Sequence, residues 1–343
     1  MTSNASLRMS RRRRVVGAVL GKVSSLQRHR ARIRKSWRSW TKFIITCRQY
    51  ISLPVFEQFQ SVEDLYNERV RLIQEQGKTV FDYQAFSRRR RSDVVYILGS
   101  GPSINEISDR QWATIAEEDS IGFNLFFAHD FVPTFYHMEF TPENYSLVAE
   151  IWRRKKQYPA GMPLLVNSMH VDLHQSLGKY ELSECTQFTV PRSASQYGAS
   201  NLNVLLSIFR RRKALEERGF YSHYRGSLDL IVSMMVLLGY RKIVLLGIDL
   251  VDLRYFFHDA DLYPSPEAAM VRQFHLHSLE KSKASGRLKQ CNRTFDPSVA
   301  RGYLTIDVFL KLYYEMVMQP LGVTMSIASR QSPMARFLPF ERI

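Results

Sequence analysis

Residues 93–106 read DVVYILGSGPSINE, and this stretch carries the strongest local signal for the fold. Residues 94–98 form an apolar run that is rich in β-branched side chains and has no polar alternation. Such a run is typical of a strand covered on both faces, as in a parallel sheet. Gly99, Ser100 and Gly101 follow, and the two glycines permit a tight turn and a close approach of a ligand to the backbone.

A helix start is expected directly after this turn. Pro102 fixes a helix-compatible φ, and Ser103 and Glu106 have the spacing of a capping box. The exposed N–H groups and the dipole of a helix start favour a phosphate group. The motif is neither a complete GxGxxG nor a P-loop, so an ordinary strand-to-helix turn is the alternative interpretation.

Composition places the basic charge at one end of the chain. Residues 1–50 supply +14 of the net charge of +16, because they hold 14 Lys and Arg and no Asp or Glu. The other 293 of the 343 residues therefore carry only +2. The three cysteines, Cys47, Cys185 and Cys291, lie far apart without a CxxC pair. This spacing predicts a reducing compartment, no disulfide framework and no zinc site.

The basic segment 1–50 also carries aromatic side chains, among them Trp37, Trp40 and Phe43. A basic helix with such residues favours an anionic membrane surface. A basic leader without a partner and a nucleic-acid-binding segment are the alternatives, and the nearly neutral remainder of the chain disfavours nucleic acid. The apolar run after Arg14 is too short for a secretion signal, and no segment reaches the ~18 apolar residues of a membrane span. We therefore expect a cytoplasmic protein that associates peripherally with a membrane.

The rest of the chain alternates helical and strand-like patterns. Helices are expected within residues 51–92, 104–118, 144–158, 225–240 and 305–318, and strands within 120–129, 134–140, 162–168, 241–250 and 323–329. Residues 251–300 look loop-like, and residues 170–223 are interpreted as an irregular lid or acceptor-binding segment. This order predicts an α/β fold with an open, mostly parallel sheet.

Polar residues at the ends of the expected strands are candidates for ligand contacts. Asn124 lies inside an apolar run, where either a structural hydrogen bond or a ligand would satisfy its amide. Asp249 follows a buried strand, where it is either a ligand contact or a turn residue. Ligands of open α/β sheets bind at the carboxyl ends of the strands, so both residues are candidates, and both interpretations stay open for each of them.

Four stretches together suggest a family. They are ILGSGPSINEI (97–107), GFNLFF (122–127), FYHMEFTP (135–142) and RGSLDLIVSMMVLLGYRKIVLLGIDL (225–250). In this combination the chain resembles the bacterial sialyltransferases of glycosyltransferase family 42 over about residues 93–340. It is similar, less specifically, to archaeal pterin pyrophosphokinase-like proteins that share the GxGPS start.

The resemblance implies a Rossmann-like fold of a GT-A variant that binds a CMP-sugar without an obligatory metal or other cofactor. It places the nucleotide on Gly99, Ser100, Gly101, Asn124, Thr141, Gly226 and Ser227, and a phosphate-stabilising tyrosine on Tyr255. Two departures stand out. The family has Asn where this chain has Ser100, and its general-base histidine is missing, since residues 301–303 read RGY.

A different histidine must then remove the acceptor proton in a sugar transfer. His258 is the first candidate, because it follows Asp249 by nine residues and lies within reach of a cleft at the strand ends. The predicted reaction is an inverting transfer from a nucleotide-sugar donor to a glycan or glycolipid acceptor. The alternatives are a Mg²⁺-dependent pyrophosphoryl transfer, with Asp249, Asp259 and Asp261 as ligands, and a nucleotide-binding scaffold without catalysis.

Overall fold

The computed structural model describes residues 53–141, 144–155, 157–193, 206, 222–224, 226–250, 254–284 and 304–343. The basic segment 1–50 lies outside the described residues. The chain divides into two compact units, Met1–Phe56 and Glu57–Ile343, and the second carries the fold. None of the described helices is both long and apolar enough to cross a membrane.

The described residues form a seven-stranded, fully parallel sheet in the order β5-β4-β3-β2-β1-β8-β9. Its strands are β1 Val94–Leu98, β2 Asp119–Phe123, β3 Phe135–Met138, β4 Leu164–Asn167, β5 Thr186–Thr189, β8 Lys242–Leu246 and β9 Thr324–Ile327. A separate parallel pair joins β6 Arg192–Ser193 to β7 Ser222–His223. The predicted open α/β fold with a parallel core is confirmed.

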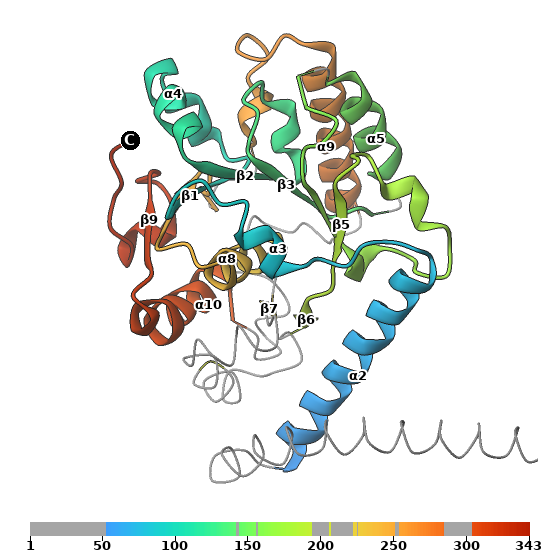
Figure 1. Ribbon diagram of the computed structural model, residues 1–343. Helices are drawn as coiled ribbons and strands as arrows, with labels where there is room; N and C mark the ends of the chain where they lie inside the picture. The colour runs from blue at the N-terminus through green and yellow to red at the C-terminus, as the bar shows by residue number, and fades with distance from the viewer. Residues whose placement is uncertain are drawn as a thin grey trace, which may run out of the picture. The chain divides into compact units, whose positions relative to one another are not determined.

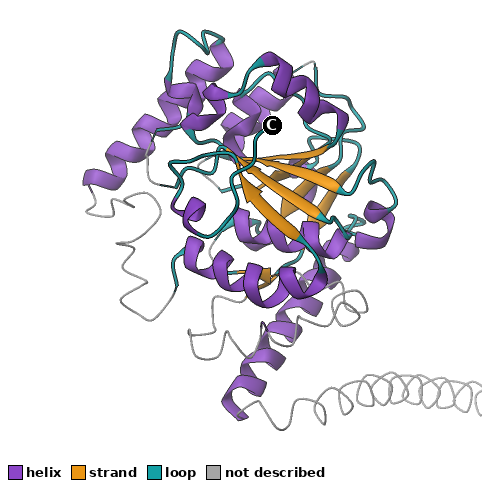
Figure 2. Cartoon of the chain, turned by 90° about the vertical axis from the view of Figure 1, so that its left-hand side faces the viewer, coloured by secondary structure: helices purple, strands orange, loops and turns teal. Residues whose placement is uncertain are grey.

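Helices cover both faces of the sheet. Helices α4, α5 and α9 lie on one side and α3, α8 and α10 on the other (Figure 1), and Figure 2 shows the strands fanned between them. The α-helices are α2 Leu53–Glu75, α3 Tyr83–Ser87, α4 Asp109–Glu117, α5 Tyr145–Arg154, α8 Ser227–Leu238, α9 Pro266–Ala284 and α10 Ile306–Tyr313. Shorter turns are η1 Pro102–Glu106, η2 Asn124–Ala128, η3 Ser168–His170, η4 Leu177–Tyr180, η5 Phe256–His258, the π-helical η7 Tyr314–Met318, η8 Gln319–Leu321 and η9 Pro333–Arg336.

The direction of the chain reverses between β1 and β8. From β1 the chain moves outward through β2, β3, β4 and β5, and it then returns to the other side of β1 as β8 and β9. In open α/β sheets, ligands bind outside the carboxyl ends of the strands at such a switch point. The register pairs Leu98 with Leu246 at the ends of β1 and β8, so the two following turns lie side by side.

Burial explains why the patterns of β1 and α8 are so apolar. Residues 95–98 of β1 are all buried, because helices cover both faces of the sheet. Every residue of α8 is buried as well, including the polar Ser227, Asp229 and Ser233. A helix that is apolar on all sides is expected where both of its faces are covered by protein.

The structure corrects three local expectations. The loop-like region 251–300 contains the 19-residue helix α9, and the irregular region 170–223 contains β5, the edge strand of the main sheet. Their patterns are weak because α9 is largely polar and exposed and β5 has only four residues. The expected capping box of Ser103 and Glu106 is also wrong, since η1 has no side-chain cap and the box is made by Ser108 and Gln111 at α4.

Candidate functional site

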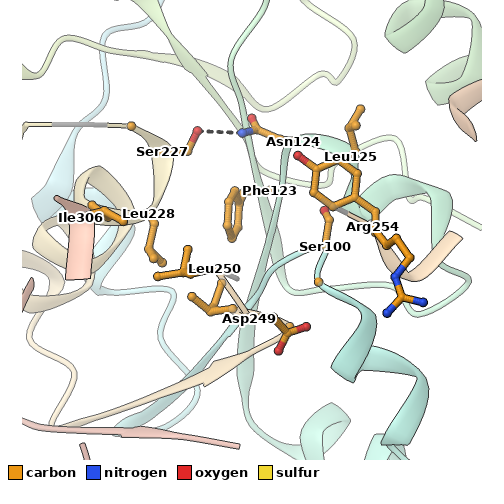
Figure 3. Close-up of a pocket in the computed structure, with 15 residues that line it drawn as sticks. Ser100, Phe123, Asn124, Leu125, Ser227, Leu228, Asp249, Leu250, Arg254 and Ile306 are labelled. Atoms are coloured by element: carbon orange, nitrogen blue, oxygen red, sulfur yellow. Dashed lines mark hydrogen bonds between the residues drawn. The ribbon is translucent and has the colours of Figure 1, made fainter. Parts of the chain in front are cut away.

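A cavity of about 260 Å³ opens at the switch point. The ends of β1, β2 and β8 and the start of α8 form its walls (Figure 3). The lining residues are Ser100, Gly101, Phe123, Asn124, Leu125, Gly226, Ser227, Leu228, Gly247, Ile248, Asp249, Leu250, Arg254, Tyr255 and Ile306. Seven of the residues predicted from the sequence are among them: Ser100, Gly101, Asn124, Gly226, Ser227, Asp249 and Tyr255.

The turn after β1 is bound to the turn after β8 through its backbone. The Gly99 N–H donates to the Leu246 carbonyl at 2.8 Å, and the Gly101 N–H donates to the Gly247 carbonyl at 2.8 Å. The Ser103 N–H donates to Asp249 Oδ2 at 2.9 Å. These three amides were predicted to bind a phosphate, but they already have hydrogen-bond partners within the protein. Gly99, Pro102 and Ser103 are not among the lining residues.

Gly101 is required by the close approach of the two turns. A Cβ added there would lie 2.3 Å from Asp249 Oδ2 and 2.8 Å from the Gly247 carbonyl oxygen, which is closer than atoms can pack. Gly247 itself has a φ of +63°, a conformation that favours glycine. The pair of turns is thus a rigid floor of the cavity, built on glycines from both strands.

Asp249 is the acidic residue among those that line the cavity. Its side chain is buried, with 3% of its surface exposed, and Oδ2 is engaged by Ser103. The second oxygen, Oδ1, is buried and has no hydrogen-bond partner among the described residues. A buried acceptor without a partner is costly and rare, so this oxygen is suited to a ligand that donates a hydrogen bond.

The start of α8 forms another wall. Gly226, Ser227 and Leu228 line the cavity, so the positive end of a 12-residue helix dipole faces it. The Asp229 carboxylate fixes this start by accepting from the Gly226 N–H at 2.9 Å and from the Tyr224 N–H. The amides of the first helical residues are therefore held in position beside the cavity.

Two residues with unusual backbone conformations line the same cavity. Asn124 has a φ of 49° and Leu250 a φ of 59°, and they are the described non-glycine residues with a positive φ. Asn tolerates this region, but a bulky Leu does so at a cost of order 1–3 kcal/mol. Such strain concentrates at ligand sites, which supports the assignment of this cavity as the functional site.

Asn124 and Thr141 have clear structural roles. Asn124 begins η2 directly after β2, donates from Nδ2 to Ser227 Oγ at 2.8 Å and accepts from the Glu139 N–H at 3.2 Å. Figure 3 shows the Asn124–Ser227 bond at the rim of the cavity. Thr141 does not line the cavity; its hydroxyl accepts from the Asn144 N–H at 3.3 Å, before α5.

The two predicted catalytic residues differ in their relation to the cavity. Tyr255 lines the cavity, whereas His258 does not and lies with its Nε2 2.9 Å from Nδ1 of His275 on α9. The Tyr255 and His275 ring centroids are 4.3 Å apart, so the histidine pair lies next to a residue that lines the cavity. Burial, and then the neighbouring His258, lower the pKa of His275 to about 4. His275 is therefore neutral at neutral pH.

The apolar side of the cavity was not predicted from the sequence. Leu228, Leu250 and Ile306 lie opposite Ser100 and Arg254 in Figure 3. Ile306 at the start of α10 is remote in the chain from the other lining residues, and no motif marks it. Asp259 and Asp261, expected as magnesium ligands in the alternative reaction, do not line the cavity, and Asp259 Oδ1 accepts from the Asp261 N–H at 3.2 Å.

The fold and the cavity define an open parallel α/β protein with a cavity at its switch point. No protein-family model matches the sequence, and no curated protein matches it. The solved structures that resemble the chain include the sialyltransferase CstII from Campylobacter jejuni in complex with a substrate analogue, cytidine-5'-monophosphate. The two sequences are 16% identical, the match covers 73% of this chain and 85% of that chain, and the TM-score is 0.34. At this identity and TM-score the likeness carries no argument about function.

Proposed function

We propose that the switch-point cavity binds a nucleotide-activated sugar and that the protein is a glycosyltransferase of the sialyltransferase-like kind. One observation carries the proposal: the cavity combines a helix N-terminus, small hydroxyl side chains and an apolar wall with Asp249, whose buried Oδ1 has no hydrogen-bond partner among the described residues. A nucleotide has the matching groups, namely ribose hydroxyls, a phosphate and a planar base. The CMP-linked donor follows from the sequence resemblance.

Each wall of the cavity suits one part of the donor. Asp249 Oδ1 accepts a hydrogen bond from a ribose hydroxyl, which gives the carboxylate the partner that it lacks among the described residues. The start of α8 at Ser227 receives the phosphate, because helix N-termini favour anions. The start of α8 thus takes the role that the sequence had suggested for the amides after β1, because those amides donate hydrogen bonds to β8 and to the turn after it. Arg254 adds a positive charge beside the phosphate.

The proposed reaction is a direct, inverting displacement. The acceptor hydroxyl oxygen forms a bond to the anomeric carbon while the bond from that carbon to the phosphate oxygen breaks. The nucleotide leaves with the bonding electron pair, and Tyr255 and the start of α8 stabilise its phosphate. The hydroxyl proton passes to a base, for which His258, paired with His275, is the candidate. The acceptor is a glycan or glycolipid near an anionic membrane surface, which segment 1–50 binds.

A thermal-shift panel tests the nucleotide class. The purified protein is heated with CMP, UDP, GDP or ATP, each with Mg²⁺ and with EDTA. We expect CMP to raise the melting temperature most, equally with and without Mg²⁺, because a ligand that binds the folded state stabilises it. Stabilisation by ATP that EDTA abolishes would instead support pyrophosphoryl transfer, and no shift with any nucleotide would overturn the proposal.

A His258→Ala variant tests the base. Removal of a general base lowers turnover by about 10²–10⁴-fold, while nucleotide binding persists because His258 is outside the cavity lining. Transfer of the sugar from a CMP-linked donor is measured beside the CMP thermal shift, with His277→Ala on the exposed side of α9 as the control. Undiminished turnover would exclude His258. A wild-type protein that binds CMP but transfers no sugar would instead support the alternative of a nucleotide-binding scaffold without catalysis.

A further inference from the structure

A cluster of metal-ligating side chains lies outside the cavity. Glu139 follows β3, His170 ends η3 after β4, and His223 ends β7 just before α8. One ligand atom from each of the three side chains lies within 4.8 Å of the others. Sequence spacing gives no hint of this cluster, because its members are on three distant segments that only the fold brings together.

The separation of these atoms suits a single ion. His223 Nε2 lies 3.6 Å from Glu139 Oε1. Two ligands of a tetrahedral zinc ion, each bound at about 2.0–2.1 Å, are about 3.3 Å apart. Side-chain adjustments of less than about 1 Å would therefore bring all three atoms into the coordination sphere of one ion.

Neighbouring groups support a ligand role for these side chains. Asn167 Nδ2 donates to Glu139 Oε1 at 2.9 Å and holds the carboxylate, as outer partners of metal ligands do. His223 Nε2 is buried and has no hydrogen-bond partner among the described residues.

We propose that Glu139, His170 and His223 bind a divalent transition-metal ion, with Zn²⁺ as the best match. Two imidazoles and one carboxylate form a ligand set that zinc proteins use, with a further position left for water. His170 is exposed, which gives the ion a path from solvent. The site is independent of the proposed function, because none of its three ligands lines the cavity.

The ion would join three segments of the fold near α8. Glu139 is also linked to the start of α8 through Asn124, which accepts from the Glu139 N–H and donates to Ser227. His223 precedes that helix by a few residues. Binding of Zn²⁺ is therefore expected to stabilise the folded chain.

Calorimetric titration of the chelator-treated, full-length protein with Zn²⁺ tests the site. We expect the wild type to bind Zn²⁺ at one saturable site. The affinity of this site for Zn²⁺ should be at least tenfold weaker in Glu139→Gln, His170→Ala and His223→Ala. His174→Ala, an exposed histidine outside the cluster, is the matched control and should bind as the wild type does. His170 is exposed, so His170→Ala is expected to fold. Loss of Zn²⁺ binding in this variant would therefore not be explained by unfolding.

Two further measurements distinguish this site from other zinc binding. Zn²⁺ should raise the melting temperature of the wild type and of His174→Ala but not of His170→Ala. Co²⁺ in place of Zn²⁺ should give visible absorption without the charge-transfer band of a cysteine ligand. Equal Zn²⁺ affinity in the wild type and His170→Ala, or no saturable binding in the wild type, would overturn the proposal and leave Glu139 and His223 as an ion pair.

Discussion

At the scale of single residues, His129 is the clearest source of pH dependence. It is 9% exposed and lies among aromatic rings, stacked on Phe126 at 5.2 Å, and its Nδ1 accepts from the Phe131 N–H at 2.9 Å. Burial lowers its pKa from 6.5 to about 4 in net effect, opposed by Asp130 and assisted by Lys155. His129 is therefore neutral in the folded protein at pH 7 and is protonated more readily when the chain unfolds.

The sign of this effect follows from linkage. Because the pKa is lower in the folded state, the stabilisation is complete above pH 6.5 and is lost as the pH falls toward 4. This residue alone should remove about 2 kcal/mol of stability between pH 7.5 and pH 5. The free energy of unfolding in urea is measured at the two pH values. It should change less between them in His129→Gln than in the wild type, by about 2 kcal/mol. An unchanged difference would mean that His129 titrates normally.

Asp249 allows a residue-scale test of the cavity. An Asp249→Asn variant keeps an oxygen that can accept from the Ser103 N–H, so it should fold, but it loses the charge that would bind a ribose hydroxyl. Hydrogen bonds to charged groups contribute about 1.5–3 kcal/mol, which predicts a loss of CMP affinity of at least tenfold. Affinity is measured by calorimetry, with Asp109→Asn at the exposed start of α4 as the control. Equal affinity in the two variants would remove Asp249 from the site.

At the scale of elements, the turns after β1 and β8 approach so closely that they leave no room for an added side chain at Gly101. A Gly101→Ala variant places a Cβ against Asp249 and Gly247 and forces the two turns apart. Overpacking of this kind costs about 1–3 kcal/mol.

Gly226→Ala is the matched control for this prediction. It adds the same methyl group where no atom lies within 4 Å, and its φ of 171° is extended backbone that any residue adopts. The free energy of unfolding, measured in urea, should be lower in Gly101→Ala than in the wild type. In Gly226→Ala it should change by no more than about 0.5 kcal/mol. Similar losses in both variants would show that the clash is absorbed elsewhere.

The elements that were predicted well are those with a strong local signal. The strand at residues 94–98 matches β1, and the apolar helix with a small-residue start matches α8, because both are buried on all sides and their sequences carry no polar face. Asn124 shows the limit of this reasoning. Its apolar neighbours suggested a continuing strand, whereas the chain turns into η2 there with a positive φ, which hydrogen bonds to Ser227 and Glu139 accompany.

At the scale of the whole molecule, the sequence indicated where the site lies but not how it is completed. Ser100, Asn124 and Asp249 follow strands, and parallel strands bring their carboxyl ends together, so their convergence was predictable. The engagement of the first turn by Asp249 depends on the adjacency of β1 and β8, which lie far apart in the sequence. The cluster of Glu139, His170 and His223 could not be predicted for the same reason, because its members come from three segments that lie far apart in the sequence.

The uneven charge of the chain leads to a prediction about membranes. Replacement of Arg11, Arg12, Arg13 and Arg14 by Gln should weaken co-sedimentation of the full-length protein with vesicles that contain phosphatidylserine by tenfold or more. Each basic residue near an anionic surface contributes about 1 kcal/mol, and this contribution falls with added salt. Neutral phosphatidylcholine vesicles should show little difference between the wild type and the variant.

The control must remove the same charge from the folded unit. Arg88, Arg89, Arg110 and Arg153 are exposed there, and their replacement by Gln lowers the net charge equally. If the basic segment 1–50 binds the membrane, this variant should sediment with anionic vesicles as the wild type does. Equal weakening in both variants would indicate that net charge alone attracts the protein to the vesicles. The peripheral membrane location would then lose its support, although the reaction proposed at the cavity would not depend on it.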